Sequence, residues 1–220
     1  MKQRAAFFDL DNTLIEGSSL CYFLKGLIRH GEITKRHLAR IALEHYRFQR
    51  KKTESESAMT LATKKLLEFA IDRPQSHLIE LCQKIVADFL PRSINEEVRK
   101  RIHEHQSQGI DTWIITASPV ELAEIVAHDL NMTGALGTRG EVINGLYSGR
   151  VLDGAMHGKK KATSLITLAE QKGYDLEKSF AYSDSINDLP MLISVGNPHI
   201  VNPNKELTLI ARKNNWPIVA

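Results

Sequence analysis

The sequence predicts an α/β fold: a parallel sheet flanked by helices, with an all-helical insertion and a small β-hairpin. Three short apolar runs end in polar residues and are each followed by a helical pattern, which is typical of buried parallel strands. Residues 18–92 read as helical throughout, and Asn144-Gly145 between β-prone pieces indicates a tight hairpin. With 220 residues, the chain is long enough for one large core that carries one insertion.

The first strand is expected at Ala5–Leu10, and two carboxylates lie at its end. Asp9 and Asp11 are two residues apart where the chain leaves the sheet, so both can approach one ligand. Carboxylates are hard oxygen ligands suited to Mg²⁺, and a carboxylate can also attack phosphorus. The alternative is a turn in which Asp and Asn cap the next helix.

A helical insertion follows, so we expect a core of residues 1–17 and 93–220 and an insertion of residues 18–92. Caps and apolar spacing predict four helices in the insertion, at Ser19–Arg29, Thr34–Lys51, Ser55–Ile71 and Pro74–Leu90. Lys and Arg outnumber Glu between Lys25 and Lys52. This excess indicates a solvated helix face or, alternatively, a surface for an anionic substrate or an acidic partner.

The core resumes with two helix starts and a second strand. Residues 93–96, Ser-Ile-Asn-Glu, have the spacing of a capping box and predict a helix that runs to Gly109. Thr112–Ile115 predicts a strand that ends at Thr116, and a second capping box at residues 118–121 predicts a helix start directly after it. The Thr116 hydroxyl and the following backbone N–H groups could bind phosphate oxygens. An isolated strand threonine, however, more often bonds to its own backbone.

A hairpin and a cluster of lysines come next. Residues 137–151 contain Gly and Asn-Gly between β-prone pieces, which predicts a hairpin beside the sheet. Lys159, Lys160 and Lys161 precede the helical run Ala162–Gln171. One of their ammonium groups could neutralise a phosphate and an attacking carboxylate together, whereas at least two are expected to be solvated. The residues alone do not choose among the three.

The third strand, at Phe180–Tyr182, ends in Ser183 and Asp184 and brings a second carboxylate pair. Asp184 follows the strand directly and is the better direct metal ligand, while Asp188 could hold a metal-bound water or orient a neighbour. The alternative for Asp188 is to cap the helix that begins near Leu189. Because the carboxyl ends of parallel strands meet at one edge of a sheet, we expect the three polar strand ends to converge.

Composition limits the class of partner. A net charge of +3 falls well short of a dedicated nucleic-acid binder, and no apolar run reaches the roughly 18 residues of a membrane span. Cys21 and Cys82 are far apart in apolar contexts, so we expect two buried thiols rather than a disulfide or metal framework. We therefore expect a cytoplasmic protein whose partner is a small phosphorylated metabolite. No nucleic-acid or membrane partner is expected, and the oligomeric state stays open.

Combined, these features resemble the four ordered motifs of the haloacid dehalogenase superfamily: Asp9-x-Asp11-x-Thr13-Leu14, Thr116, a lysine before a helix, and Asp184-x-x-x-Asp188. Within the superfamily, the chain is similar to the phosphoserine-phosphatase-like branch, subfamily IB. Four further stretches carry this second likeness, at residues 116–119, 182–185, 188–192 and 195–198. The resemblance covers the expected core and implies a Rossmann-like sheet with a mobile, all-helical cap of the C1 type over the site.

The resemblance implies a role for each matching residue. Asp9 would be the nucleophile and Asp11 the general acid and base, with Mg²⁺ held by Asp9, Asp184 and the backbone carbonyl of Asp11. The phosphate group would be bound by Thr116, Ala117 and Lys161, with Lys160 as the fallback. Asp188 and Asn187 would support these groups from just outside the metal ligands. Phosphoserine phosphatases carry a substrate-binding Glu where this chain has Ser18, which argues against recognition of the phosphoserine ammonium group. The nearby Glu16 could compensate if the loop is arranged differently, so Ser18 and Glu16 are the candidate substrate-selecting residues.

The implied activity is a magnesium-dependent phosphomonoester hydrolase that acts on a small metabolite through an aspartyl-phosphate intermediate. The same phosphoenzyme could instead be intercepted by an acceptor hydroxyl, which would make the protein a phosphotransferase or phosphomutase. A third alternative is a non-catalytic, phosphate-responsive binding module.

Overall fold

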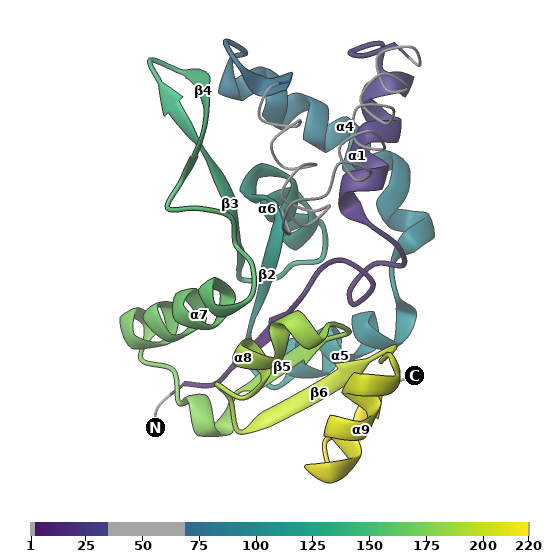
Figure 1. The fold of residues 1–220 in the computed structure, drawn as a ribbon, viewed down its shortest axis with the longest axis vertical. Coiled ribbons are helices and arrows are strands. Elements are labelled where there is room, and N and C mark those ends of the chain that lie inside the picture. The colour runs from purple at the N-terminus through teal and green to yellow at the C-terminus, as the bar shows by residue number, and fades with distance from the viewer. Residues whose placement is uncertain (1–2, 35–68, 220) are drawn as a thin grey trace, which may run out of the picture.

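The structure is a computed structural model that describes residues 3–34 and 69–219. The described residues form a seven-stranded sheet with helices on both faces (Figure 1). The strands are β1 (Ala5–Phe8), β2 (Asp111–Pro119), β3 (Gly134–Ile143), β4 (Leu146–Leu152), β5 (Phe180–Ser183), β6 (Asn197–Val201) and β7 (Ile218–Val219). The α-helices are α1 (Ser19–Arg29), α4 (Gln75–Ser93), α5 (Glu96–Ser107), α6 (Val120–Asp129), α7 (Lys159–Lys172), α8 (Leu189–Leu192) and α9 (Lys205–Lys213). Short 3₁₀ turns lie at Leu176–Lys178 and Ile186–Asp188. The predicted helix Thr34–Lys51 and most of Ser55–Ile71 lie outside the described residues.

The order of the strands brings the predicted polar strand ends together. The sheet runs β4-β3-β2-β1-β5-β6-β7, with every neighbouring pair parallel except the antiparallel β3 and β4. Strand β1 pairs with β2 on one side and with β5 on the other, in registers that place Phe8 beside Ile114 and Tyr182. The residues that follow these three positions therefore share one edge of the sheet, which confirms the predicted α/β fold with parallel strands.

Strand β1 is buried on both faces because its alternate side chains enter different cores. Phe8 packs in the cluster formed with α1, α4, α5 and α6, where its ring stacks on Tyr182 at a centroid distance of 4.5 Å. Phe7 packs in the second cluster, with α7, α8 and α9. The nucleophile candidate thus follows a strand that is fixed from both sides.

Both predicted capping boxes are wrong, for the same physical reason: their side chains are used elsewhere. Helix α4 runs on to Ser93, whose hydroxyl donates to the carbonyl of Phe89, and Asn95 caps α5 by accepting from two backbone N–H groups. Helix α6 begins at Val120 without a side-chain cap. The Ser118 and Glu121 side chains, which were expected to cap it, instead bond to residues far along the chain.

The predicted hairpin is confirmed. Asn144 and Gly145 form its turn with φ of 52° and 83°, the left-handed region that a tight hairpin turn of this type requires. The hairpin does not merely flank the sheet, since β3 pairs with β2 and β4 is the edge strand. It also binds the segment before α4, because Tyr147 accepts from the backbone N–H of Asp72 and donates its own to the carbonyl of Arg73, both at 3.0 Å.

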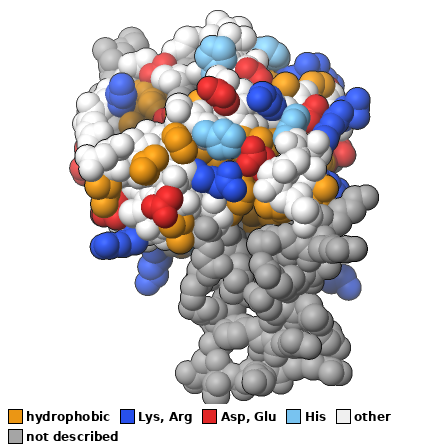
Figure 2. Space-filling view, turned by 90° about the horizontal axis from the view of Figure 1, so that it is seen from above, with side chains coloured by type: hydrophobic (Ala, Val, Ile, Leu, Met, Phe, Trp, Pro, Cys, Tyr) orange, Lys and Arg blue, Asp and Glu red, His pale blue; other side chains and the backbone are white. Residues whose placement is uncertain are grey.

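Helices α1 and α4 lie side by side beyond the edge of the sheet at which β1, β2 and β5 end (Figure 1). They approach closely because Gly26 has no side chain, and a Cβ there would collide with Ile85. The end of the molecule beyond them mixes acidic, basic and histidine side chains on its described surface (Figure 2), including the ion pairs Arg29–Asp88 and Arg73–Glu32.

The two cysteines differ in their exposure to solvent. Cys82 is buried as predicted, whereas Cys21 is exposed on α1, so that part of the prediction was wrong. Neither thiol is in a disulfide.

In the parts of the chain that the structure describes, no helix combines the length and the apolar character needed to cross a bilayer. Near the C-terminus, β7 adds the last strand of the sheet by pairing with β6.

Candidate active site

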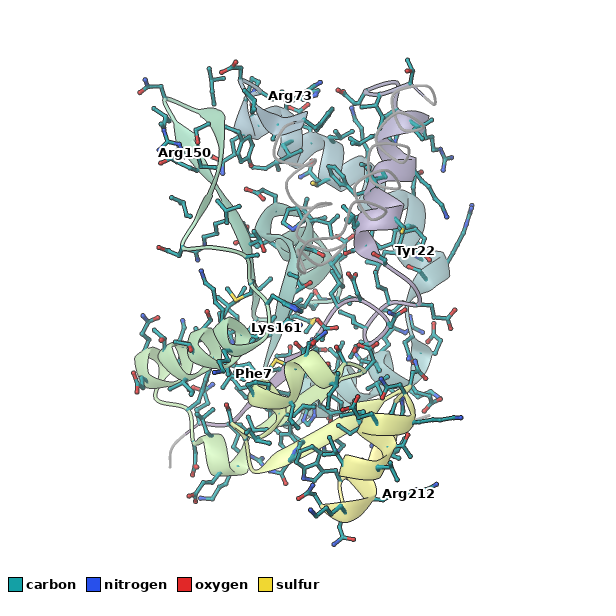
Figure 3. All side chains as sticks on the ribbon, viewed as in Figure 1. Phe7, Tyr22, Arg73, Arg150, Lys161 and Arg212 are labelled. Carbon is teal, nitrogen blue, oxygen red and sulfur yellow. The ribbon has the colours of Figure 1, made fainter. Side chains whose placement is uncertain are left out.

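Three buried, charged side chains meet at the edge of the sheet where β1 ends. The Lys161 ammonium donates to Asp9 Oδ1 at 2.6 Å and to Asp188 Oδ2 at 2.7 Å. The exposed fractions of these side chains are 4% for Lys161, 8% for Asp9 and 2% for Asp188. Figure 3 labels Lys161 where α7 begins, between the sheet and helices α1 and α4. One positive charge is thus shared by two carboxylates in a site that is nearly closed to solvent.

The start of α7 separates the three candidate lysines. Gly158 precedes the helix with φ of 54°, so the helix begins at Lys159, earlier than predicted. Lys161 lies in the first turn and faces the site, while Lys160 bonds to the carbonyls of Asp153 and Gly154. Of the two lysines that the sequence left as candidates for phosphate binding, only Lys161 contacts Asp9.

Asp188 does not cap helix α8, although it occupies the cap position. Its carboxylate accepts from Lys161 and from the Ser183 hydroxyl, the latter at 2.8 Å. Ser183 Oγ in turn accepts from the Ser185 backbone N–H at 3.2 Å. The loop after β5 therefore aims Asp188 into the site, which excludes the capping alternative.

Asp184 is held against the loop that follows β1. The Thr13 hydroxyl donates to Asp184 Oδ1 at 3.3 Å and accepts from the Asp184 backbone N–H at 3.0 Å. Because Thr13 is itself fully buried, this two-way contact fixes Asp184 relative to the Asp9 loop. Two segments more than 170 residues apart in sequence thereby form one acidic site.

Asp11 lies at the N-terminus of α1. Its Oδ1 accepts from the Ser19 backbone N–H at 2.7 Å, and the positive end of a helix favours a carboxylate in this position. Asn12 has φ of 54° and Gly17 has φ of 85°, so the intervening loop turns back and its ends bond to each other. This turn brings the start of α1 back to Asp11.

Thr116 and Ala117 lie on the last part of β2. Thr116 Oγ1 accepts from the Ser118 backbone N–H at 3.1 Å, so the structure contains the local backbone bond that was the alternative role for this threonine. The Thr116 hydroxyl can still donate its own proton to another acceptor. The Ala117 carbonyl accepts from the Thr138 hydroxyl at 2.7 Å, and that hydroxyl accepts from the Met156 backbone N–H. Strand β3 and the loop before α7 thereby support the strand end from the side.

Three predicted residues are not drawn into this network. The Asn187 and Glu16 side chains are exposed, and no contact of either with the acidic groups is seen among the described residues. Ser18 is half-buried directly before α1, and its hydroxyl does not cap that helix. Ser18 directly precedes Ser19, whose backbone N–H donates to Asp11. The backbone N–H of Glu16 instead donates to the carbonyl of Ser93 at the end of α4.

The electrostatics follow from burial in a site with more negative than positive charge. The pKa of Asp9 is raised to about 7, chiefly because the carboxylate is buried; the charge of Lys161 opposes this rise and the charge of Asp188 adds to it. Burial also raises the pKa of Asp11 and of Asp184. Burial alone would lower the pKa of Lys161, but the charges of Asp9 and Asp188 outweigh it and raise that pKa. The arrangement favours a cation and disfavours ionisation of every carboxylate at once.

Sequence reasoning did not assign roles to three residues that hold the acidic side chains: Thr13 and Ser183 through their hydroxyl groups, and Ser19 through its backbone N–H. Each contact joins residues that only the fold brings together or that depend on the local turn. The sequence contained one indication for Thr13, because this residue follows the first carboxylate pair at a fixed spacing. For the two serines the sequence contained no indication of a role, except that each lies beside a predicted helix start or strand end.

Comparison with known proteins places this site in a family. The family model described as haloacid dehalogenase-like hydrolase matches residues 6–192. The chain is 36% identical over 214 residues to the phosphoserine phosphatase SerB1 of Mycobacterium tuberculosis, covering 97% of this chain and 70% of that protein. It is 28% identical to a histidinol-phosphatase of Neisseria meningitidis, covering 97% of each.

Solved structures show the same fold. A protein of unknown function from Bordetella pertussis superposes with a TM-score of 0.85, covering 100% of this chain and 99% of that one at 24% identity. The similarity therefore extends over both the sheet and the helices beyond its catalytic edge.

Proposed function

The chain belongs to the haloacid dehalogenase-like hydrolase family, and we propose that it is a phosphatase that uses Asp9 to attack small phosphate monoesters. The observation that carries the assignment of Asp9 is its contact with Lys161 in a buried site. A carboxylate attacking a phosphate dianion meets electrostatic repulsion, and a cation that touches the nucleophile reduces that repulsion. The contact of 2.6 Å puts the Lys161 ammonium at that position.

The proposed reaction has two steps, and each uses the groups described above. In the first, an Asp9 oxygen forms a bond to phosphorus while the bond from phosphorus to the alcohol oxygen breaks, and Asp11 gives that oxygen its proton. In the second, Asp11 takes a proton from water, the water oxygen attacks phosphorus, and the bond to Asp9 breaks. Inorganic phosphate leaves, and Asp9 is again a carboxylate. Thr116, the Ala117 N–H and Lys161 hold the phosphate oxygens throughout.

The donor set fits Mg²⁺. Asp9 and Asp184 supply carboxylate oxygens and Asp11 its backbone carbonyl, which are the hard ligands that this ion prefers. Among the described residues, no three His, Cys, Asp or Glu side chains are grouped as a metal site, and the proposed ligand set accordingly includes a backbone carbonyl. Burial raises the pKa of both Asp9 and Asp184, so a bound cation would favour their ionised forms. When bound, the ion would neutralise charge on the phosphate and on Asp9.

The substrate class we propose is an alkyl phosphate of a small metabolite. The relatives' names point to phosphoserine and histidinol phosphate, both esters of a primary alcohol on an amino compound. Residues 18–92 would act as a cap over the site, with α1 and α4 as its described part. Ser18 is neutral, so contacts with an ammonium group of the substrate would have to come from elsewhere. A cytoplasmic location and a small-molecule partner stay predictions.

The test is phosphate release from a panel of esters by the purified chain. The panel holds p-nitrophenyl phosphate, phosphoserine, histidinol phosphate, glycerol phosphate and sugar phosphates, each with Mg²⁺ and with a chelator. We expect metal-dependent release from at least one ester, ranked by kcat/KM, and product analysis with added alcohol separates hydrolysis from phosphate transfer. No release from any ester with Mg²⁺ would overturn the proposal, and so would full activity in the chelator.

A further inference from the structure

Two buried serines join the first helix beyond the sheet to the strand end beside the site. The Oγ atoms of Ser19 and Ser118 are 2.5 Å apart, with exposed fractions of 0% and 7%. Ser19 is the first residue of α1, and Ser118 follows Thr116 by two residues on β2. We call this pair the serine clasp. It is a direct side-chain bond between a helix of the proposed cap and the core strand that carries the phosphate ligands.

Each serine of the clasp also holds a site residue through its backbone. The Ser19 N–H donates to Asp11 Oδ1 at 2.7 Å, and the Ser118 N–H donates to Thr116 Oγ1 at 3.1 Å. A continuous series of hydrogen bonds thus runs from Asp11 through Ser19 and Ser118 to Thr116. Any shift of α1 away from β2 would stretch the clasp and move the Ser19 N–H away from Asp11.

We propose that the serine clasp positions Asp11 for proton transfer, with Ser19 and Ser118 as positioning residues that act through Asp11. This inference rests on the proposed phosphatase function. Ser19 holds Asp11 through its N–H, and the hydroxyl bond to Ser118 fixes where that N–H points. The clasp therefore makes the alignment of the general acid depend on the seating of α1 against the core.

The role has a chemical signature, because esters differ in their need for a proton. When the phosphorus–oxygen bond of an alkyl phosphate breaks, the departing alkoxide is strongly basic and requires the proton of Asp11. A nitrophenolate is weakly basic and leaves without one. Loss of the clasp should therefore lower phosphoryl transfer from an alkyl phosphate much more than from p-nitrophenyl phosphate, whereas a loss of folded protein lowers both equally.

The experiment compares Ser19→Ala, Ser118→Ala and the double variant in the full chain. The ratio of kcat/KM for the best alkyl ester to kcat/KM for p-nitrophenyl phosphate should fall about 10-fold in each single variant. This is less than the roughly 10²–10⁴-fold of acid catalysis as a whole, because Asp11 itself is still present. The Ser19 side chain also bonds to Asp11, so the double variant should show the same ratio as Ser19→Ala: once the Ser19 hydroxyl is removed, the Ser118 hydroxyl has no partner in the clasp. Ser93→Ala is the control: it removes a buried hydroxyl at the end of α4 whose partner among the described residues is the Phe89 carbonyl of the same helix, so the ratio should not change.

Thermal unfolding of the same variants tests the clasp without any activity. The shifts in Tm of Ser19→Ala and Ser118→Ala should not add in the double variant, since both remove the same bond. Additive shifts would overturn the clasp even if the protein hydrolysed no ester. An unchanged ester ratio in active variants would overturn the positioning role and leave the phosphatase function standing. A wild type inactive on all esters, in contrast, contradicts the proposed function alone.

Discussion

The catalytic edge of the sheet and the contact beneath the hairpin are both buried and polar, but they balance charge differently. At the catalytic edge, one ammonium group, Lys161, contacts two carboxylates, Asp9 and Asp188. Beneath the hairpin, the Tyr147 hydroxyl donates to Glu121 Oε1 at 2.6 Å, so one carboxylate has a neutral donor. Burial, followed by the bond to Glu121, raises the pKa of Tyr147 and keeps its proton in place.

This difference in buried charge distinguishes the residues proposed to act in catalysis from the residues that stabilise the fold. A protein that needed only a stable core would not bury several carboxylates close together around one ammonium group, because like charges repel one another strongly away from water. The catalytic edge does so and leaves the pKa of Asp9 raised to about 7, a pattern that clusters at functional sites. Substitutions there should change activity first, whereas substitutions beneath the hairpin should change stability first.

The largest effect is expected for Asp9→Asn. The amide cannot form the bond to phosphorus, so kcat for p-nitrophenyl phosphate should fall by roughly 10⁴-fold or more, as for other lost nucleophiles. The fold should persist, since an amide next to Lys161 removes one of two buried negative charges. Steady-state kinetics and thermal unfolding of the same preparation give both values.

Asp129→Asn, an exposed position at the end of α6, provides the matched control and should keep wild-type kinetics. Substantial turnover by purified Asp9→Asn protein would remove the distinction between the two regions, because the catalytic edge would then be dispensable for chemistry.

Lys161→Met should affect both activity and stability. It leaves Asp9 and Asp188 buried without their shared cation, which costs on the order of 3–5 kcal/mol when one partner of a buried ion pair is removed. Loss of the group that neutralises the phosphate should lower kcat/KM by roughly 10²–10³-fold. Denaturant unfolding and kinetics near neutral pH measure the two effects.

Lys160→Met is the neighbouring control, since in the described part of the chain the Lys160 ammonium bonds to two backbone carbonyls outside the acidic cluster. It should change stability by less than about 1 kcal/mol and kcat/KM only slightly. Equal effects of the two substitutions would contradict the assignment of Lys161 to the site.

A third buried polar group, His105, extends the comparison to pH. Its Nε2 lies 2.9 Å from the Tyr182 hydroxyl, and burial, helped by the charge of His199, lowers its pKa to about 4. Above the ordinary histidine pKa of about 6.5, both folded and unfolded chains hold it neutral. As the pH falls from about 6.5 towards 4, His105 binds a proton in the unfolded chain but stays neutral in the folded chain. Stability should therefore drop, by on the order of 3 kcal/mol in total.

The measurement is the free energy of unfolding against pH for the wild type and His105→Gln. The variant should lose less stability than the wild type between pH 6.5 and 4. His103→Gln, an exposed position on the same helix, should retain the wild-type slope. Identical slopes in all three proteins would show that this buried histidine is not what makes stability depend on pH.

The catalytic edge could be predicted from the sequence because its groups follow strand ends. Apolar runs before Asp9, Thr116 and Asp184 predicted buried strands, and the geometry of parallel sheets then required the three ends to meet. The hairpin was equally readable, since Asn144-Gly145 satisfies a local backbone requirement. The family resemblance narrowed the lysine cluster to Lys161, with Lys160 as the fallback, before any contact was known.

Side-chain partners far apart in sequence could not be predicted in the same way. Ser118 and Glu121 have the spacing of a capping box, yet their partners are Ser19 and Tyr147, and no local pattern encodes a contact that the tertiary fold creates. Ser93 has the same spacing but lies inside the last turn of α4. Local capping signals were overruled wherever the fold offered these side chains another partner.

The smallest effect is expected for Tyr147→Phe, which bears most directly on the contrast between the two regions. It leaves the buried Glu121 carboxylate without its donor, so the free energy of unfolding should fall by about 1–3 kcal/mol. Adding Glu121→Met should recover part of that loss, because replacing both partners by apolar groups removes the unpaired charge. Throughout, kcat/KM should stay within about twofold of wild type, since neither side chain touches the acidic cluster. If Tyr147→Phe instead lowered kcat/KM as strongly as Lys161→Met while leaving unfolding unchanged, the hairpin contact would belong to the catalytic machinery. The crowding of buried carboxylates around one ammonium group would then no longer distinguish the catalytic residues from the structural ones in this protein.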